Sequence, residues 1–254
     1  MRRALVALAV LLPALFLPGR SQEARANPYD DVELLGLFRN PLAVHGEWIH
    51  FKQHGWSWTP RHVPHGWRPY SVGHWVITDY DWTWVSDEPW GWATDHYGRW
   101  FVEPSYGWVW VPGPIWGPAW VAWRQGGGFV GWAPLPPGIE ASVADIDVQL
   151  DPLAFCFVEE RFLLEPALAR HILPRARNVA FVTLTKNITR YAVVDERFVN
   201  RGVDLAEIER ASGHAVTRLR VREVNTLAGS GLRVDPRANE LIVYQPAVRP
   251  TRHR

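Results

Sequence analysis

Short stretches that alternate between apolar and polar residues fill the first half of the chain and predict a series of β-strands. Tryptophans one residue apart recur there, at Trp56-x-Trp58, Trp82-x-Trp84 and Trp108-x-Trp110. Residues i and i+2 of a strand face the same side, so each such pair places two indoles on one face. The runs 75–78 and 100–102 are rich in β-forming residues, and Gly, Pro and Asp separate the runs at hairpin distance. The pattern predicts β-hairpins.

The strands repeat along the chain. The Trp-x-Trp pairs lie 26 residues apart, and a Gly-x-Trp unit precedes each of them, at 46–48, 73–75 and 98–100. A third column of tryptophans is formed by Trp67, Trp92 and Trp116, and a degenerate fourth unit runs from Trp116 to Trp132. A period of this length indicates a supersecondary unit that packs against its copies. We predict an antiparallel meander, either an open sheet or a small closed barrel, with a cross-strand ladder of indoles.

A change in composition divides the chain. All 16 tryptophans lie between Trp48 and Trp132, and a Pro-rich segment, 134–138, follows the last of them. We therefore predict a Trp-rich repeat domain at 40–137 and a smaller α+β domain at 138–248, with a linker at 27–39 before them and a basic tail at 249–254 after them. The expected fold class is mainly β: a tandem β-hairpin, Trp-rich meander or small barrel followed by the smaller α+β domain.

Within the second domain, hydrophobic patterning predicts strands at 178–185, 188–194, 217–224 and 240–244. Asp204 has the character of an N-cap and Gly213 that of a helix stop, which predicts a short helix at 205–211. Residues 166–171 are a second candidate for a short helix.

The N-terminus has the order of a secretory signal peptide. Arg2 and Arg3 precede an apolar run at 4–17, and Ala24-Arg25-Ala26 resembles a cleavage site. The apolar run is too short to cross a hydrocarbon core of ~30 Å as a stable helix, although an uncleaved anchor is the alternative. We expect residues 1–26 to be removed, no transmembrane segment to remain, and the protein to be exported to the periplasm or the cell surface.

Charge and cysteine usage narrow the function classes. The formal net charge is +1, and loss of the signal peptide would remove four arginines and one glutamate, leaving a slightly acidic chain. Such a chain has no electrostatic basis for binding nucleic acid. The single cysteine, Cys156, excludes an intrachain disulfide, and its apolar neighbours indicate a buried thiol. No cysteine lies near the cleavage site, which argues against a lipid anchor.

Several long strings with tryptophans at fixed spacing carry a family resemblance: GWRPY (66–70), TWVSDEPWGWA (83–93), HYGRW (96–100), GWVWVPG (107–113) and VGWAPLPP (130–137). The segment from about 40 to 137 resembles an uncharacterised, tryptophan-rich bacterial domain family of unknown function, described by YxWGxW-type repeats. Members are typically exported, and some carry the domain next to FecR-like segments. The resemblance implies a fold and a location, and it implies no activity.

The tryptophans are also candidate binding residues. Each buries roughly 150–250 Å² when it is inside a protein, which suits a Trp-stapled core, but three columns of indoles must share the one core face of a meander. We therefore expect some indoles to be exposed, where flat aromatics bind sugars or the apolar surface of a partner. The candidates are the ones beside Pro and Gly near turns: Trp90, Trp92, Trp116 and Trp120.

Carboxylates lie among the tryptophans and open an enzymatic alternative. A glycosidase needs two carboxyl groups about 5–9.5 Å apart beside aromatic subsites, and the acidic residues here are Asp79, Asp81, Asp87, Glu88, Asp95 and Glu103. Their recurrence at turn positions favours turn chemistry instead. Because no nucleophile or phosphate-binding motif is present, we assign no catalytic residue and keep a carbohydrate-active hydrolase as the alternative.

Histidines and arginines complete the candidate chemistry. His50 and His54 have ligand-like spacing, but that spacing joins two side chains on a helix and not on a strand, so we expect no metal and no cofactor. Arg218, Arg220 and Arg222 alternate with apolar residues and predict a basic strand face for an anionic polymer or a partner. The leading hypothesis is a non-enzymatic binding or scaffolding module for a cell-wall or extracellular polysaccharide or an envelope protein; a purely structural envelope protein is the other alternative.

Overall fold

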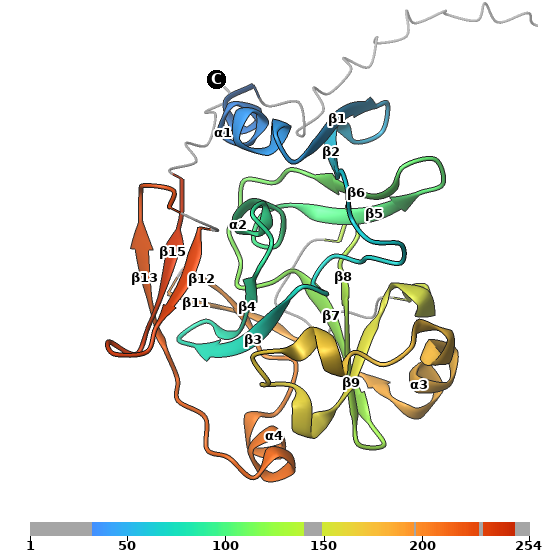
Figure 1. Cartoon of the computed structure of the whole chain (residues 1–254), viewed down its shortest axis with the longest axis vertical. Coiled ribbons are helices and arrows are strands. Elements are labelled where there is room, and N and C mark those ends of the chain that lie inside the picture. The colour runs from blue at the N-terminus through green and yellow to red at the C-terminus, as the bar shows by residue number, and fades with distance from the viewer. Residues whose placement is uncertain (1–31, 140–148, 196, 229–230, 247–254) are drawn as a thin grey trace, which may run out of the picture.

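The computed structural model describes residues 32–139, 149–195, 197–228 and 231–246 (Figure 1). The predicted signal peptide (1–26) and the basic tail (249–254) lie outside these residues. As predicted, the fold is mainly β, with fifteen strands in four sheets across the described ranges. Each of these sheets is open, so the barrel alternative is wrong for the part of the chain that is described.

Four hairpins in tandem form the Trp-rich region, as the repeat predicts. They are β1–β2 (Gly46–Phe51, Gly55–Pro60), β3–β4 (Gly73–Thr78, Asp81–Ser86), β5–β6 (Arg99–Glu103, Gly107–Val111) and β7–β8 (Val121–Gly126, Phe129–Pro134). Each hairpin sets one tryptophan directly opposite another: Trp48–Trp58, Trp75–Trp84, Trp100–Trp110 and Trp123–Trp132. Because Trp58 also pairs with Trp110, one row of four indoles crosses the sheet β1-β2-β6-β5. The predicted aromatic ladder is confirmed.

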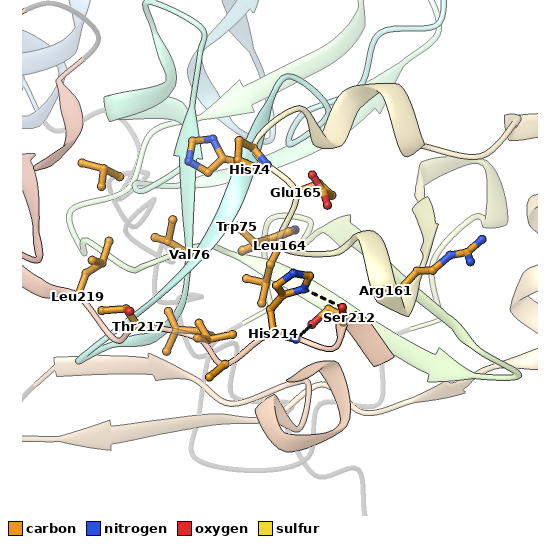
Figure 2. Close-up of a pocket in the computed structure, with 15 residues that line it drawn as sticks. His74, Trp75, Val76, Arg161, Leu164, Glu165, Ser212, His214, Thr217 and Leu219 are labelled. Atoms are coloured by element: carbon orange, nitrogen blue, oxygen red, sulfur yellow. Dashed lines mark hydrogen bonds between the residues drawn. The ribbon is translucent and has the colours of Figure 1, made fainter. Parts of the chain in front are cut away.

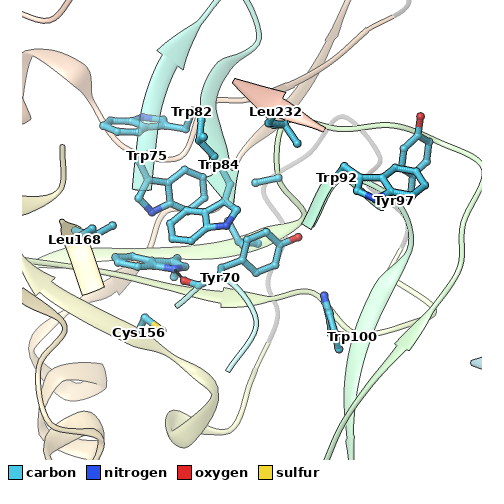
Figure 3. Close-up of a cluster of buried hydrophobic side chains, with 14 of the residues drawn as sticks. Tyr70, Trp75, Trp82, Trp84, Trp92, Tyr97, Trp100, Cys156, Leu168 and Leu232 are labelled. Atoms are coloured by element: carbon cyan, nitrogen blue, oxygen red, sulfur yellow. Dashed lines mark hydrogen bonds between the residues drawn. The ribbon is translucent and has the colours of Figure 1, made fainter. Parts of the chain in front are cut away.

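Buried indoles also connect the hairpins to neighbouring segments through hydrogen bonds. The ring N–H of Trp58 donates to the carbonyl of Leu42 at 3.0 Å, and that of Trp132 donates to the carbonyl of Tyr70 at 2.8 Å. Figure 3 shows the rings of Trp75, Trp82, Trp84 and Tyr70 gathered in one cluster. A buried N–H without a hydrogen-bond partner lowers the free energy of unfolding by about 1–3 kcal/mol. These bonds therefore allow the polar N–H edge of an indole ring to be buried in the core.

The predicted linker at 27–39 contains most of a helix, α1 (Val32–Ala43). Leu34, Phe38 and Leu42 recur every fourth residue and are buried, which gives the helix one apolar stripe. Phe38 meets Trp110 edge-on with ring centroids 5.2 Å apart. The linker interpretation is wrong for residues 32–39, because they form a helix whose apolar stripe packs against the indole core.

Strands from the second half of the chain extend the sheets of the first half. β9 (Cys156–Glu159) pairs with β8, and β10 (Lys186–Asn187) pairs with β7. β11 (Tyr191–Val194) and β12 (Arg197–Asn200) form a hairpin that joins β4 at Asn200. The composition break near residue 137 therefore does not separate the sheets.

A fourth sheet has the order β13-β15-β14 and lies beside the hairpins in Figure 1. The strand predicted at 240–244 is confirmed as β15 (Glu240–Tyr244), and the one predicted at 217–224 begins later, as β13 (Arg220–Val224). β14 (Leu232–Asp235) was not foreseen. Leu241 and Val243 are buried on the inner face of this sheet.

The helix expected at 205–211 is confirmed as α4 (Leu205–Ser212). The carboxylate of Asp204 accepts the N–H of Ala206 at 2.9 Å, and Gly213 ends the helix with φ +74°, a conformation that glycine adopts without steric cost. The helix expected at 166–171 is a 3₁₀ turn at Leu168–His171. Other short elements are α2 (Gly91–Thr94) and 3₁₀ turns at Pro152–Ala154, Glu160–Phe162 and Arg175–Arg177.

One predicted strand is wrong. Residues 178–185 form the helix α3 (Asn178–Leu184), although most of them favour strands. The hydroxyl of Thr183 donates to the carbonyl of Val179, and that of Thr185 donates to the carbonyl of Phe181. Phe181 is the one fully buried apolar side chain of this helix, so packing overrides propensity. Among the described helices, none has the length and apolar character needed to cross a membrane.

Candidate functional site

Of the four tryptophans chosen as contact residues, two are buried and two keep partial exposure. Trp92 is 1% exposed and Trp120 is 2% exposed, and Trp90 and Trp116 are half-buried. Trp120 donates its ring N–H to the carbonyl of His96 at 2.9 Å and lies under the guanidinium of Arg99 at 3.9 Å. Trp116 stacks on His96 with ring centroids 5.2 Å apart. The expected exposure of Trp92 and Trp120 is therefore wrong.

The reason lies in the glycines that accompany these tryptophans. A Cβ atom at Gly117 would lie 2.7 Å from the ring of Trp120, and one at Gly46 would lie 2.4 Å from the ring of Trp58. A glycine beside a tryptophan thus makes room for a buried ring here and does not mark an exposed turn. Ten of the sixteen tryptophans are buried, and the remaining six are half-buried.

Partly exposed aromatic side chains gather at one groove, formed by the end of β2, the connection from β2 to β3 and the β5–β6 turn. Its volume is about 170 Å³, and its lining includes Trp67, Tyr106 and Trp108 together with Pro60 and Pro64. Tyr106 is 48% exposed. We call this site the aromatic groove. It is smaller than the roughly 300–1,000 Å³ of a drug-sized pocket, so it fits a single ring or side chain.

Hydrogen bonds hold the walls of the aromatic groove in place. The ring N–H of Trp67 donates to the Glu88 carboxyl group at 2.7 Å. Glu103 accepts the N–H of Tyr106 at 3.0 Å and so shapes the turn that carries this ring. The hydroxyl of Thr59 donates to the carbonyl of Trp108 at 3.0 Å. Walls fixed in this way reduce the conformational entropy lost on binding.

No sequence pattern points to the aromatic groove. Trp67 and Trp108 were recognised as members of the repeat, and Tyr106 was not singled out. Trp108 differs from Trp110 in its position on β6. Trp110 lies inside the row of four indoles, whereas Trp108 lies two residues nearer the β5–β6 turn, opposite Val102. This difference follows from strand register, which the spacing of tryptophans alone does not reveal.

Two carboxyl groups lie buried behind the aromatic groove. Glu88 is 7% exposed and Asp95 is 1% exposed. Burial, and then the proximity of Asp95, raise the pKa of Glu88 to about 9, and burial raises the pKa of Asp95 to about 7. Neither residue lines the aromatic groove. Acids enclosed in this way have no access to a glycosidic bond, and Glu88 instead holds the ring of Trp67 in place.

The other acidic residues act in turns and ion pairs. Asp79 accepts the N–H of Val221 at 3.1 Å, and Asp81 forms an ion pair with Arg218 at 2.8 Å. The carboxylate of Glu103 accepts the N–H of Ser105 at 2.7 Å. Over the described ranges, no group of three or more His, Cys, Asp or Glu residues is arranged to hold a metal ion.

The three arginines of the predicted basic face do not lie on one face, and each of them forms an ion pair with a carboxylate. Arg218 precedes β13 and binds Asp81 on the β3–β4 hairpin, whereas Arg222 pairs with Glu240 at 2.8 Å and Arg220 pairs with the same carboxylate at 3.5 Å. Arg218 therefore does not belong to the face of Arg220 and Arg222. Arg233, which the sequence analysis did not consider, lies across β15 from Arg222, and both line a groove of about 360 Å³.

Comparison with known proteins finds a likeness in the hairpin region. Residues 39–139 match a family of unknown function (DUF6600). The matched segment contains all four tryptophan hairpins, β1 to β8. No curated protein and no solved structure matches the chain. The family carries no assigned activity, so function has to be argued from the geometry.

Proposed function

We propose that this chain is an exported protein of the bacterial cell envelope that acts as a non-enzymatic binding or scaffolding module, and that the aromatic groove holds one ring of a cell-wall or extracellular glycan. The observation that carries this proposal is the groove itself. Trp67, Tyr106 and Trp108 leave ring surface exposed there, while most of the other tryptophans are enclosed. The signal-peptide pattern at 1–26 supports export.

Aromatic ring faces suit sugars because a pyranose presents a polarised C–H face that packs on a flat π surface. A small concave site with few polar groups gives such a ring a desolvated platform. Tyr106 supplies both a ring face and a hydroxyl group at the rim. The walls are already fixed by Glu88, Glu103 and Thr59, so binding would order few side chains.

Binding is favoured over hydrolysis because the groove lacks an opposed pair of carboxylates. Glycoside hydrolysis requires two carboxyl groups that face the scissile bond, and none of the residues lining the groove is acidic. A purely structural role is the second candidate. The indole hydrogen bonds that connect a hairpin to a distant segment favour it, such as that from Trp82 to the carbonyl of Val203 at 2.9 Å.

Glycan binding is tested by calorimetry and pull-down with purified peptidoglycan fragments and envelope polysaccharides. Tyr106→Ala and Trp108→Ala are expected to weaken binding by roughly ten-fold or more, as for central aromatic contacts. Trp56→Ala is the matched control, because Trp56 is also half-buried but lies outside the groove, under Arg39 at 4.7 Å. Equal losses in all three variants, or no binding by the unaltered chain, would contradict the glycan proposal and leave the structural role.

Export is tested independently of the ligand. The chain expressed in a bacterium is expected in the periplasmic or extracellular fraction, with a mature N-terminus at Asn27. A cytoplasmic protein that retains Met1 would overturn the envelope assignment.

Binding of an anionic wall polymer or an envelope protein at Arg220 and Arg222 belongs to the same proposal. Substitution of both arginines by glutamine is expected to weaken this binding in low salt.

A further inference from the structure

A groove on the outer face of the small sheet β13-β15-β14 is separate from the aromatic groove. Its volume is about 360 Å³, within the roughly 300–1,000 Å³ of ligand pockets. Three of its lining residues form one row across the sheet, because Arg222 on β13 and Arg233 on β14 both lie opposite Ile242 on β15. Residues in such a row point to the same face of a sheet. We call this site the basic groove.

The charge of the basic groove has one sign. Among the described residues that line it, two are arginines and none is acidic. Asn225, Thr226 and Tyr244 are the neutral polar residues of the lining. The carboxylate of Glu240 belongs to the same face of the sheet but lies outside the lining. The groove therefore attracts anions.

Both arginines have hydrogen-bond donors to spare. Arg222 donates its Nε–H to the Glu240 carboxylate at 2.8 Å, and its two terminal nitrogens donate to no other group in the described part of the chain. Arg233 is exposed and forms no ion pair within that part. The planar fork of an arginine matches a carboxylate or a phosphate. Two such forks thus line one groove with unused donors.

The spacing of the two arginines suits one anion between them. Neighbouring strands lie about 4.8 Å apart, so the Cα atoms of Arg222 and Arg233, on either side of β15, are roughly 10 Å apart. Salt largely screens two exposed like charges at this distance, so their repulsion costs the unliganded chain little. An anion between them contacts both guanidinium groups. Ile242, below the pair, is 8% exposed, and such an apolar floor strengthens the interaction with the anion.

The larger concavity beside β3 has a different charge. Its volume is about 470 Å³, and Figure 2 shows Arg161 and Glu165 among the residues that line it. Arg161 also forms an ion pair with Glu159 at 2.7 Å. Opposite charges at one opening offset each other, so that concavity does not select an anion. The single sign of charge is therefore a property of the basic groove and not of every concavity of the chain.

We propose that the basic groove binds one anionic group, a phosphate or a carboxylate, of an envelope polysaccharide. Arg222 and Arg233 would each donate to the anionic oxygens, while Asn225 and Thr226 would meet the sugar that carries the group. This inference rests on the proposed glycan function and adds a second, charged subsite to it. Arg220 does not line the groove, so Arg233 takes its place as the partner of Arg222.

NMR titration of the isotope-labelled full chain at low salt tests the site with glucuronic acid and glucose 6-phosphate, and with neutral glucose as the reference. Both anions are expected to bind at least roughly ten-fold more tightly than glucose, because hydrogen bonds to charged groups are the stronger ones. Arg222→Gln and Arg233→Gln are each expected to weaken the binding of the anions by roughly ten-fold and to leave glucose unaffected. Added salt is expected to weaken anion binding as well.

Arg237→Gln is the matched control, because Arg237 is an exposed arginine of the β14–β15 turn that does not line the groove. It removes the same charge and is expected to leave anion binding nearly unchanged. Tighter binding of glucose 6-phosphate would support a phosphate, and tighter binding of glucuronic acid would support a carboxylate.

Three results would overturn the inference: anions that bind no more tightly than glucose, anion binding that Arg233→Gln leaves intact, or an equal loss in Arg237→Gln. Binding of neutral glycans at the aromatic groove, without binding of either anion, would reject this inference and leave the proposed function standing. Anion binding that depends on Arg233, without any glycan at the aromatic groove, would reject the aromatic site and keep the basic one.

Discussion

The hairpin region and the three-stranded sheet β13-β15-β14 are held together by different means. Each hairpin has one cross-strand pair of indoles, and rings of different hairpins contact one another, as Trp75 does with Trp123 with ring centroids 4.5 Å apart. In the small sheet the core consists of aliphatic side chains such as Leu241 and Val243, and its outer face carries the ion pairs of Glu240. One region has a continuous aromatic interior, and the other has a thin aliphatic layer.

This difference indicates which region supports the other. The hairpins bury large rigid rings that contact several elements at once, whereas strands from the second half, such as β9, β10 and β12, add to edges of sheets that hairpins have already formed. Trp123 connects the two halves directly, because its ring N–H donates to the side chain of Asn200 at 2.7 Å. We therefore expect the hairpins to set the stability of the whole chain.

The largest expected effect comes from removing an indole of the central cluster. Trp132→Ala is expected to lower the free energy of unfolding by about 3–5 kcal/mol, because it leaves a large cavity and removes the bond to Tyr70. Leu241→Ala is the comparison in the small sheet. It is expected to speed hydrogen exchange in β13–β15 while the unfolding midpoint followed by tryptophan fluorescence changes little.

The two substitutions are compared by urea unfolding, with fluorescence for the hairpins and hydrogen exchange for the small sheet. If Leu241→Ala shifts the fluorescence midpoint as far as Trp132→Ala does, the two regions unfold as one unit. The prediction that the hairpins set the stability of the whole chain, while the small sheet opens separately, would then be wrong.

A second test uses pH. Burial and the nearby Asp95 raise the pKa of Glu88 to about 9 from an ordinary value of 4.5. Above about pH 4.5, unfolding therefore releases the proton that the folded state retains, and the free energy of unfolding falls as the pH rises toward about 9. Asp95, with a pKa raised to about 7, acts in the same direction over a narrower range.

Glu88→Gln is expected to flatten this pH dependence, since the amide carries no titrating proton and its carbonyl still accepts the Trp67 N–H. Urea unfolding at several pH values between about 5 and 9 measures the slope. Glu165→Gln, at an exposed carboxyl group, is the control. An unchanged slope in Glu88→Gln would show that this acid is not the group that titrates.

A smaller effect is expected where a glycine lies against a ring. A Cβ atom at Gly202 would lie 2.1 Å from the ring of Trp123, so Gly202→Ala is expected to cost about 1–3 kcal/mol through overpacking. At Gly36, in α1, nothing lies within 4 Å of the added atom. Gly36→Ala is expected to stabilise by about 0.5–1 kcal/mol because alanine favours helix. Thermal unfolding of both variants checks the contrast, and equal effects would contradict it.

The smallest effect is expected at the ion pairs of the small sheet. Glu240→Gln removes the carboxylate shared by Arg220 and Arg222. Because both arginines are exposed, the loss is expected to be about 0.2–1 kcal/mol and to shrink as salt is added. Urea unfolding at low and high salt measures it. A loss as large as that of Trp132→Ala would mean that this sheet is held by charge more than by packing.

The hairpins were predictable because their determinants are local. Tryptophans two residues apart, preceded by a turn, specify a strand pair without reference to the rest of the chain. The same holds for α4, whose cap is Asp204 and whose stop is Gly213. The helix α3 was not predictable, because its β-branched residues favour strands and only the docking of Phe181 selects the helix. The stripe of α1 was overlooked because its partner, the indole core, is remote in sequence.

The candidate site was harder to predict than the fold. Which tryptophan keeps an exposed face depends on register and on the chain segments that cover it. Position beside glycine and proline predicts contacts at Trp92 and Trp120, which the structure encloses. No such signal marks Trp67, Tyr106 and Trp108, which line the aromatic groove. A glycine beside a tryptophan is typical of a turn, although in this chain it makes room for a buried ring.

The central claim is that most indoles form the core and that contact aromatics are confined to the aromatic groove. Hydroxyl-radical footprinting of the full chain, read residue by residue by mass spectrometry, tests it most directly. The account predicts fast oxidation at Tyr106, intermediate oxidation at Trp67 and Trp108, and protection at Trp92 and Trp120. Oxidation of Trp92 and Trp120 as fast as that of Tyr106 would contradict it.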